Sequence, residues 1–241
     1  MNPNAMRPFG LALLDYHQGN LSSTLVIERD DGWLADLPMK TFFRQARDFE
    51  LEGKAMDLCR GRVLDVGAGS GIHSLYLQSQ DLLVSAIDVS PEAVKVMRER
   101  GVKDVRQLDL FDLKHEKFDT TIMMGRGIGV VQTLAGVRRF LAHIRRLLKP
   151  AGTVLLTSLD VCKSHEGRDL AYQKNNIERG RYPGEIRMRF VFRDIKGLWF
   201  IWLQVDPETL QSEAAKDGWR CRIVSQQDDG NYLASLTSPG P

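Results

Sequence analysis

Residues 63–71 read Val63-Leu64-Asp65-Val66-Gly67-Ala68-Gly69-Ser70-Gly71. The apolar run from Arg62 to Val66 predicts a buried strand, and the glycines that follow predict a tight turn leading into a helix. Glycine has no Cβ, so its backbone can adopt positive φ and approach a ligand closely. A strand, a glycine-rich turn and a helix in this order are typical of the first unit of a nucleotide-binding α/β fold.

The chain after this turn continues to alternate short apolar runs with helical periodicity. The apolar runs predict strands at residues 82–88, 105–109, 118–124 and 153–158. Helices are expected at residues 91–101 and 134–148. This alternation predicts repeated βαβ units and therefore a mainly parallel sheet.

Composition and charge exclude several classes of protein. The 241 residues are 43% hydrophobic and 27% charged, which excludes disorder, collagen and coiled coil as overall descriptions. The net charge of +2 is too small to attract nucleic acid or an anionic membrane by the overall charge of the chain. No apolar run reaches the ~18 residues of a membrane-spanning helix, and the run from Phe9 to Leu14 is short for a secretory signal. We therefore expect no membrane partner.

The cysteines favour a reducing compartment. Cys59, Cys162 and Cys221 are scattered and odd in number, which does not suit a disulfide framework, and a cytoplasmic location is expected. Cys162 and His165 form half of a zinc-ligand pattern that has no second half. No metal is expected.

An acidic residue ends the second predicted strand. Asp88 follows Gly67 at about the 20-residue spacing at which a carboxylate accepts hydrogen bonds from a ribose diol in this kind of fold. The dinucleotide pattern GxGxxG requires a third glycine where this chain has Ile72, or where it has Ser74 if the pattern starts at Gly69. These residues indicate an adenosine-type cofactor and disfavour a pyrophosphate.

At these residues the chain resembles the class I S-adenosylmethionine-dependent methyltransferases. The resemblance extends in order and spacing from about Arg62 to Ser158. Residues 63–71 resemble the first motif of the family, 86–90 the second, 107–110 the third and 118–125 the fourth, and the turn at 148–152 is also familiar in the family. The resemblance implies that the cofactor is S-adenosylmethionine.

The resemblance also implies which residues contact that cofactor. The implied contacts are Asp65, Gly67, Ala68 and Gly69 in the first motif, Asp88 at the ribose hydroxyls, Asp109 at the adenine amino group, Val89 and Leu110 beside the adenine ring, and Gly125 at the methionine part.

The same resemblance implies the fold. It predicts an α/β protein with a Rossmann-like, doubly wound, mainly parallel seven-stranded sheet and an antiparallel last strand, and closing strands near Cys221 and Tyr232 agree with it. Strict alternation at 186–193, followed by a return strand at 198–205, predicts an inserted β-hairpin. We expect one methyltransferase domain over residues 1–241, made of an N-terminal cap (1–55), a cofactor-binding core (62–158), the insertion with the hairpin (160–206), and a closing helix and strands (207–241).

The acceptor can be narrowed by what the chain lacks. A sulfonium methyl is already electrophilic, so the protein must chiefly align a nucleophile, and only a hydroxyl acceptor also needs a base. The fourth-motif region has no N-P-P-Y-like tetrapeptide and no Pro-Cys nucleophile, so methylation of base amino groups, glutamine or pyrimidine carbon is not expected. We expect transfer to an oxygen, nitrogen or sulfur of a small-molecule acceptor.

Arg126 and His17 are the candidate catalytic residues. Arg126 follows the fourth predicted strand of the core, whose exit faces the transferring methyl group in this fold. His17 is a candidate base or acceptor contact. Further candidates for acceptor contact are Asp15, Tyr16, Trp33, Phe42 and Phe43, whereas His73 is expected to pack at the entry of its helix.

Three alternative functions stay open. The basic segment from Lys163 to Lys196 has interleaved aromatic residues and would suit an RNA methyltransferase, although the alternating Arg187, Arg189 and Arg193 are better explained as the solvated face of a ribbon. A nicotinamide-dependent oxidoreductase is disfavoured by Ile72, and a non-catalytic cofactor-binding module would share the same sequence features. The sequence does not indicate the oligomeric state.

Overall fold

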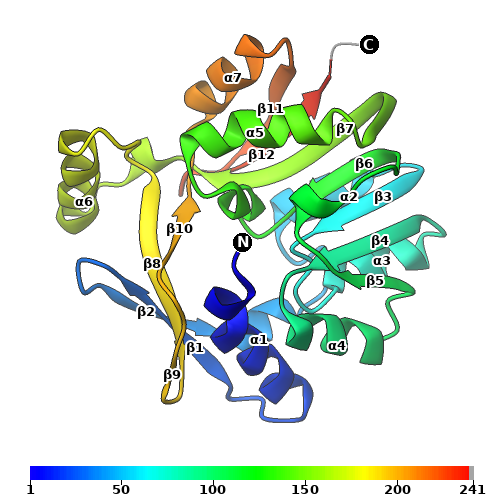
Figure 1. The fold of residues 1–241 in the computed structure, drawn as a ribbon, viewed down its shortest axis with the longest axis horizontal. Helices are drawn as coiled ribbons and strands as arrows, with labels where there is room; N and C mark the ends of the chain where they lie inside the picture. The colour runs from blue at the N-terminus through cyan, green and yellow to red at the C-terminus, as the bar shows by residue number, and fades with distance from the viewer. Residues whose placement is uncertain (239–241) are drawn as a thin grey trace.

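The computed structural model describes residues 1–238 and contains two β-sheets (Figure 1). The larger sheet has seven strands in the order β5 (Asp104–Gln107), β4 (Leu83–Asp88), β3 (Arg62–Val66), β6 (Phe118–Met123), β7 (Leu148–Leu159), β12 (Asn231–Thr237) and β11 (Arg220–Gln226). Strands β3 to β7 pair in parallel, and β12 runs antiparallel to both β7 and β11. The predicted Rossmann-like α/β fold with an antiparallel last strand is confirmed.

Helices cover both faces of this sheet. One face carries α2 (Glu50–Leu58), α3 (Ile72–Ser79) and α4 (Pro91–Glu99), and the other carries α5 (Leu134–Ile144) and α7 (Pro207–Lys216). The apolar stripe expected on α5 is buried, because Val137, Phe140, Leu141 and Ile144 are inaccessible to solvent.

The winding direction of the sheet changes at β3. Its two neighbours are β4 and β6, so the chain builds outward on one side of β3 and then returns to the other side. In a doubly wound sheet, ligands bind outside the carboxyl ends of the strands at such a switch point. The glycine-rich turn leaves β3 at this place.

The helix expected at residues 134–148 is shorter than predicted. It ends at Ile144, and β7 begins already at Leu148. Leu147 accepts a backbone hydrogen bond from Phe118 at 2.8 Å, and Leu148 pairs with Phe118 in the sheet. Pairing with β6 therefore ends the helix earlier in the chain than Pro150 and Gly152 would.

The second sheet joins two segments that the sequence treats separately. Its order is β10 (Phe200–Leu203), β8 (Glu185–Phe192), β1 (Thr24–Arg29) and β2 (Leu34–Pro38), and the short β9 (Ile195–Lys196) also pairs with β8. Strand β1 pairs antiparallel with β8, with Val26 opposite Val191. The N-terminal segment and the predicted hairpin thus form one sheet, which stands beside the larger sheet in Figure 1.

The remaining elements attach this second sheet to the core. Helix α1 (Pro3–His17) packs between the second sheet and α4, through a buried apolar cluster that includes Leu13, Leu25, Ala93 and Phe190. Helix α6 (Gly167–Glu178) lies in the expected insertion at residues 160–206, ahead of the hairpin. The short helices are η1 (Met39–Phe42), η2 (Leu110–Asp112), η3 (Gly127–Val131) and η4 (Val161–Lys163). Among residues 1–238, no helix has the length and apolar character needed to cross a membrane.

Candidate active site

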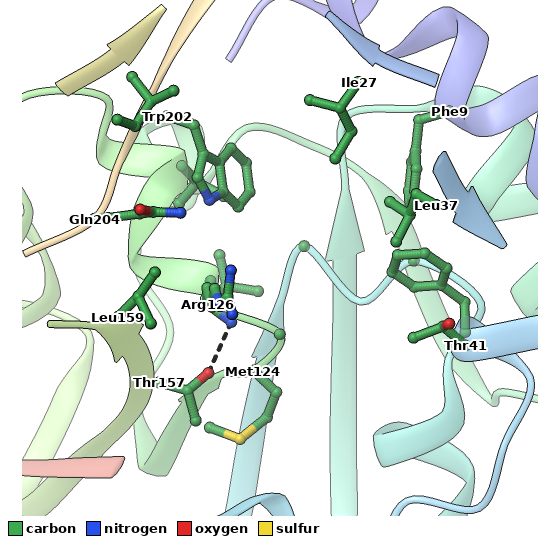
Figure 2. Close-up of a pocket in the computed structure, with 18 of the residues that line it drawn as sticks. Phe9, Ile27, Leu37, Thr41, Met124, Arg126, Thr157, Leu159, Trp202 and Gln204 are labelled. Carbon is green, nitrogen blue, oxygen red and sulfur yellow. Dashed lines mark hydrogen bonds between the residues drawn. The ribbon is translucent and has the colours of Figure 1, made fainter. Parts of the chain in front are cut away.

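A cavity of about 870 Å³ lies between the two sheets. One wall consists of the carboxyl ends of β3, β4, β6 and β7 with the turns that follow them, and the opposite wall comes from α1, η1 and the second sheet. The opposite wall is largely apolar, and Figure 2 shows Phe9, Ile27, Leu37 and Trp202 among the side chains around the cavity. We call the wall formed by the strand ends and their turns the polar wall, and the opposite wall the apolar wall.

The glycine-rich turn forms the floor of the polar wall. Gly67, Gly69 and Gly71 have φ of 68°, 58° and 80°, values that residues with a Cβ rarely adopt. The N–H groups of Gly67 and Ala68 donate to the carbonyl oxygen of Ile87 at 2.9 and 3.2 Å, which ties the turn to β4. The structure thus brings Gly67, Ala68 and Gly69 to the surface of the cavity.

Asp88 stands next to this turn at the end of β4. Its Oδ2 accepts from the Gly69 N–H at 3.0 Å, and its Oδ1 accepts from the Ser90 N–H at 2.9 Å. The side chain is buried, and burial raises the pKa of Asp88 although these backbone hydrogen bonds oppose the rise. Each carboxylate oxygen can accept a further hydrogen bond, so Asp88 can receive two hydroxyl donors from a ligand in the cavity.

Asp65 is a second buried carboxyl group in the same wall. It accepts a hydrogen bond from Ser74 Oγ at 2.7 Å, and burial raises the pKa of its carboxyl group. The nearby charge of His73 opposes that rise. Asp65 and Asp88 both line the cavity, so two of the implied cofactor contacts lie on either side of the glycine-rich turn.

Asp109 and two apolar residues form the end of the cavity near η2. Asp109 caps η2 by accepting from the Phe111 N–H at 2.9 Å, and its other oxygen contacts the amino group of Met1. Val89 and Leu110 line the cavity beside it. A carboxylate that can accept a hydrogen bond, next to two apolar side chains, suits an adenine ring and its amino group.

Gly125 and Arg126 follow β6 and line the cavity. The Arg126 backbone has φ 60° and ψ 35°, a left-handed conformation that costs a residue with a Cβ about 1 to 3 kcal/mol. Its N–H donates to Thr157 Oγ1 at 2.8 Å, and its side-chain Nε donates to Asn231 Oδ1 at 2.8 Å. Figure 2 shows the Arg126 side chain in the middle of the cavity, below Trp202.

His17 lies elsewhere. It is not among the described residues that line the cavity, and its Nε2 lies 3.1 Å from Glu99 Oε2 on α4 while its ring stacks on Phe43. Asp15 and Tyr16 likewise belong to this side of α1, where Asp15 pairs with Arg193. The prediction that His17 contacts the acceptor has no support from its position, because α1 turns this face toward α4 and not toward the cavity.

Of the other residues predicted to contact the methyl acceptor, some line the cavity and others lie on the far side of α1. Trp33 and Phe42 line the cavity, whereas Phe43 packs against Tyr16 outside it. His73 also lines the cavity, although sequence reasoning assigned it only to packing.

His73 belongs to a charged cluster that sequence reasoning missed. Its Nε2 lies 2.7 Å from Glu52 Oε2, and the guanidinium of Arg44 contacts the same oxygen. Burial would raise the pKa of Glu52, but the hydrogen bond from His73 and the charge of Arg44 outweigh it and lower that pKa. The sequence does contain a signal for this cluster. Glu52 lies three and four residues before Ala55 and Met56, a spacing that places its carboxylate on the buried face of α2.

The arginines of the basic hairpin are paired. Arg189 forms an ion pair with Glu28 at 2.8 Å, Arg187 with Asp30 at 3.7 Å and Arg193 with Asp15 at 2.6 Å. Arg187 and Arg189 also lie over the ring of Trp199. The second sheet therefore neutralises much of the positive charge that suggested an RNA surface.

Comparison with known proteins adds independent findings. A family model described as a methyltransferase domain matches residues 64–156. The ubiquinone biosynthesis O-methyltransferase of Xanthomonas campestris pv. campestris (strain B100) is 31% identical over 99% of this chain and 100% of its own length. The enzyme of the same description from Xanthomonas oryzae pv. oryzae (strain PXO99A) is 31% identical over 66% of this chain and 67% of its own.

A solved structure agrees over the whole fold. It is a SAM-dependent methyltransferase from Bacteroides fragilis in complex with S-adenosyl-L-homocysteine, 35% identical to this chain. It covers 99% of this chain and 97% of its own, with a TM-score of 0.86. The likeness therefore includes the second sheet as well as the core.

Proposed function

This chain belongs to the class I S-adenosylmethionine-dependent methyltransferases, and on that basis we propose that it methylates a hydroxyl oxygen of a small organic acceptor held between its two sheets. The enzyme uses S-adenosylmethionine to methylate a small molecule; the choice of oxygen is the proposed part. It is supported by full-length relatives that are described as O-methyltransferases.

The polar wall fits the cofactor. We assign the methionine part to Asp65, Gly67, Ala68, Gly69 and Gly125, where glycines without a side chain leave room for close approach. The ribose hydroxyls are assigned to the buried carboxylate Asp88. The adenine ring is assigned to the space between Val89 and Leu110, with Asp109 accepting from its amino group. When bound, the cofactor supplies an electrophilic methyl group.

The acceptor is assigned to the apolar wall. The observation that carries this assignment is the shared cavity, which places Ile27 and Trp202 of the second sheet opposite the β6 exit with Arg126. Such a wall excludes water and holds an organic acceptor in line with the methyl group, which is most of what this chemistry requires. Arg126 is retained as a proposed acceptor contact, and His17 is not.

The chain is also proposed to act in the cytoplasm. Cys59, Cys162 and Cys221 are free thiols in the structure, as a reducing compartment requires.

A labelled-methyl screen tests the proposed reaction. The protein is incubated with a metabolite extract and S-adenosylmethionine carrying an isotopic label on the methyl group, and the products are identified by mass spectrometry. We expect a small-molecule methyl ether or ester whose amount falls when the Asp88→Ala variant is used at the same cofactor concentration. Label found only on nitrogen, on sulfur or in RNA would contradict the proposed acceptor class.

A further inference from the structure

Arg126 carries a charge that the described residues do not neutralise. Its Nε donates to Asn231, but neither Nη group has a hydrogen-bond partner within residues 1–238, and no carboxylate there lies within ion-pair distance. The other two arginines of the cavity are paired: Arg29 contacts Asp31 and Asp169, and Arg44 contacts Glu52. Among the three arginines that line the cavity, Arg126 therefore differs from the other two in having no carboxylate partner within the described residues.

A polar chain orients this guanidinium without neutralising it. Asp229 accepts from the backbone N–H of Asn231 at 2.9 Å and from its Nδ2 at 2.7 Å. Asn231 then presents its Oδ1 to Arg126 Nε. The carboxylate of Asp229 is therefore separated from Arg126 by the side chain of Asn231. The neutral amide of Asn231 orients the guanidinium through Nε and leaves both Nη groups free.

The surroundings make the unpaired charge unfavourable on its own. Arg126 is half-buried, and Figure 2 shows the apolar side chains of Met124, Leu159 and Trp202 around it. Burial lowers the pKa of Arg126, although the charge of Asp229 opposes this. A buried cation without a counter-charge is costly, and an oxyanion that enters beside it offsets that cost with charge-assisted hydrogen bonds.

We propose that Arg126 is the anion-binding residue of the acceptor site and that the methyl acceptor carries an oxyanion there. This inference rests on the proposed function, because it names the chemical class of the acceptor bound in that site. Two sources share the chemistry: a carboxylate attached beside the hydroxyl group, or the hydroxyl oxygen itself in its ionised form. The two free Nη groups form a fork that matches either one.

The test compares anions with neutral analogues of the same shape. Benzoate and benzamide probe the attached carboxylate, while 4-nitrophenolate and 4-nitrotoluene probe the ionised hydroxyl. Binding is measured by calorimetry on the protein saturated with S-adenosylhomocysteine. We expect at least one anion to bind about 10- to 100-fold more tightly than its neutral analogue. The anion that is preferred identifies the source.

Two variants test whether the free charge of Arg126 is responsible. Arg126→Gln removes the charge. The double variant Asp229→Asn with Asn231→Asp keeps Arg126 and the net charge but moves the carboxylate into contact with Nε. Both variants are expected to lose the preference for the anion while binding the neutral analogue as before. Thermal unfolding and S-adenosylhomocysteine affinity verify that each variant is folded.

The outcomes separate this inference from the proposed function. It is overturned if neither anion is preferred, or if the preference survives in both variants. Labelled ethers of neutral acceptors in the metabolite screen would also overturn it while leaving the O-methyltransferase assignment intact. Anion binding that depends on Arg126, together with label only on nitrogen, would instead support the anion site and refute the proposed oxygen acceptor.

Discussion

Gly129 lies directly beneath the indole ring of Trp202, so closely that a Cβ on Gly129 would stand 2.0 Å from Cε2 of the ring. This contact joins η3, which follows the Arg126 loop, to β10 of the second sheet. Gly129→Ala must therefore displace either the ring or the loop. We expect kcat/KM for the acceptor to fall about 10- to 100-fold, because small displacements of positioning groups have effects of this size.

The cofactor affinity of the Gly129→Ala variant should be unchanged, since the polar wall is not touched. Gly167→Ala is the matched control, because a Cβ at Gly167 meets nothing within 4 Å. Steady-state kinetics with varied acceptor, together with calorimetry for S-adenosylhomocysteine, check both expectations. Equal acceptor kinetics for the two variants would show that Trp202 does not shape the acceptor site.

Asp88→Ala should weaken cofactor binding by about 1 to 3 kcal/mol, a factor of about 5 to 150 in Kd, because a ribose diol would lose its charged and desolvated acceptor. Calorimetry with S-adenosylhomocysteine measures the change. Asp194→Ala, in the exposed turn between β8 and β9, is the control. Unchanged affinity in Asp88→Ala would reject the ribose assignment.

Glu52→Gln should destabilise the fold by about 1 to 3 kcal/mol at neutral pH, because it leaves the half-buried charge of Arg44 without its charged partner. The folded-state pKa of Glu52 lies below its ordinary value of 4.5. Its stabilising contribution is therefore present above pH 4.5 and is lost as the pH falls below that value toward the lower folded-state pKa.

Urea unfolding of wild type and Glu52→Gln at a series of pH values checks this prediction. The difference in free energy of unfolding between the two proteins should shrink as the solution becomes more acidic than pH 4.5. A difference that stays constant with pH would mean that the carboxylate charge is not what stabilises the cluster.

RNA binding should be negligible and insensitive to salt, because the hairpin arginines are already paired with acids of α1, of β1 and of the turn after β1. Fluorescence anisotropy with a labelled RNA over a range of salt concentrations measures it. The variant Glu28→Gln with Asp30→Asn frees Arg189 and Arg187 and should gain weak, salt-sensitive binding. Tight binding by the wild type that falls steeply with salt would revive the RNA methyltransferase alternative.

The polar wall could be predicted from sequence because its signals are local. The strand, the glycine-rich turn and Asp88 lie within one βαβ unit, where glycine permits positive φ and strand ends share one edge. Arg126 could be placed for the same reason, since it directly follows β6. Its unpaired charge could not, because Asn231 and Asp229 approach it from the far end of the chain.

The apolar wall could not be predicted because its partners are distant in sequence. Nothing local in β1 specifies that Val26 lies opposite Val191, and strand pairing between remote segments depends on packing across the whole fold. The side of α1 on which His17 lies could not be predicted either, because the packing of α1 against α4 decides which side of the helix faces the cavity. Glu52 was overlooked although its spacing marked it.

The separate origin of the two walls has an evolutionary consequence. Strands β1, β8 and β10 carry the surface to which the acceptor is assigned, and none of them contributes the glycine-rich turn, Asp88 or Asp109. Substitutions at well-separated positions have nearly additive effects. Residues such as Ile27 and Trp202 can therefore be exchanged to suit a different acceptor while the methyl donor continues to be held as before.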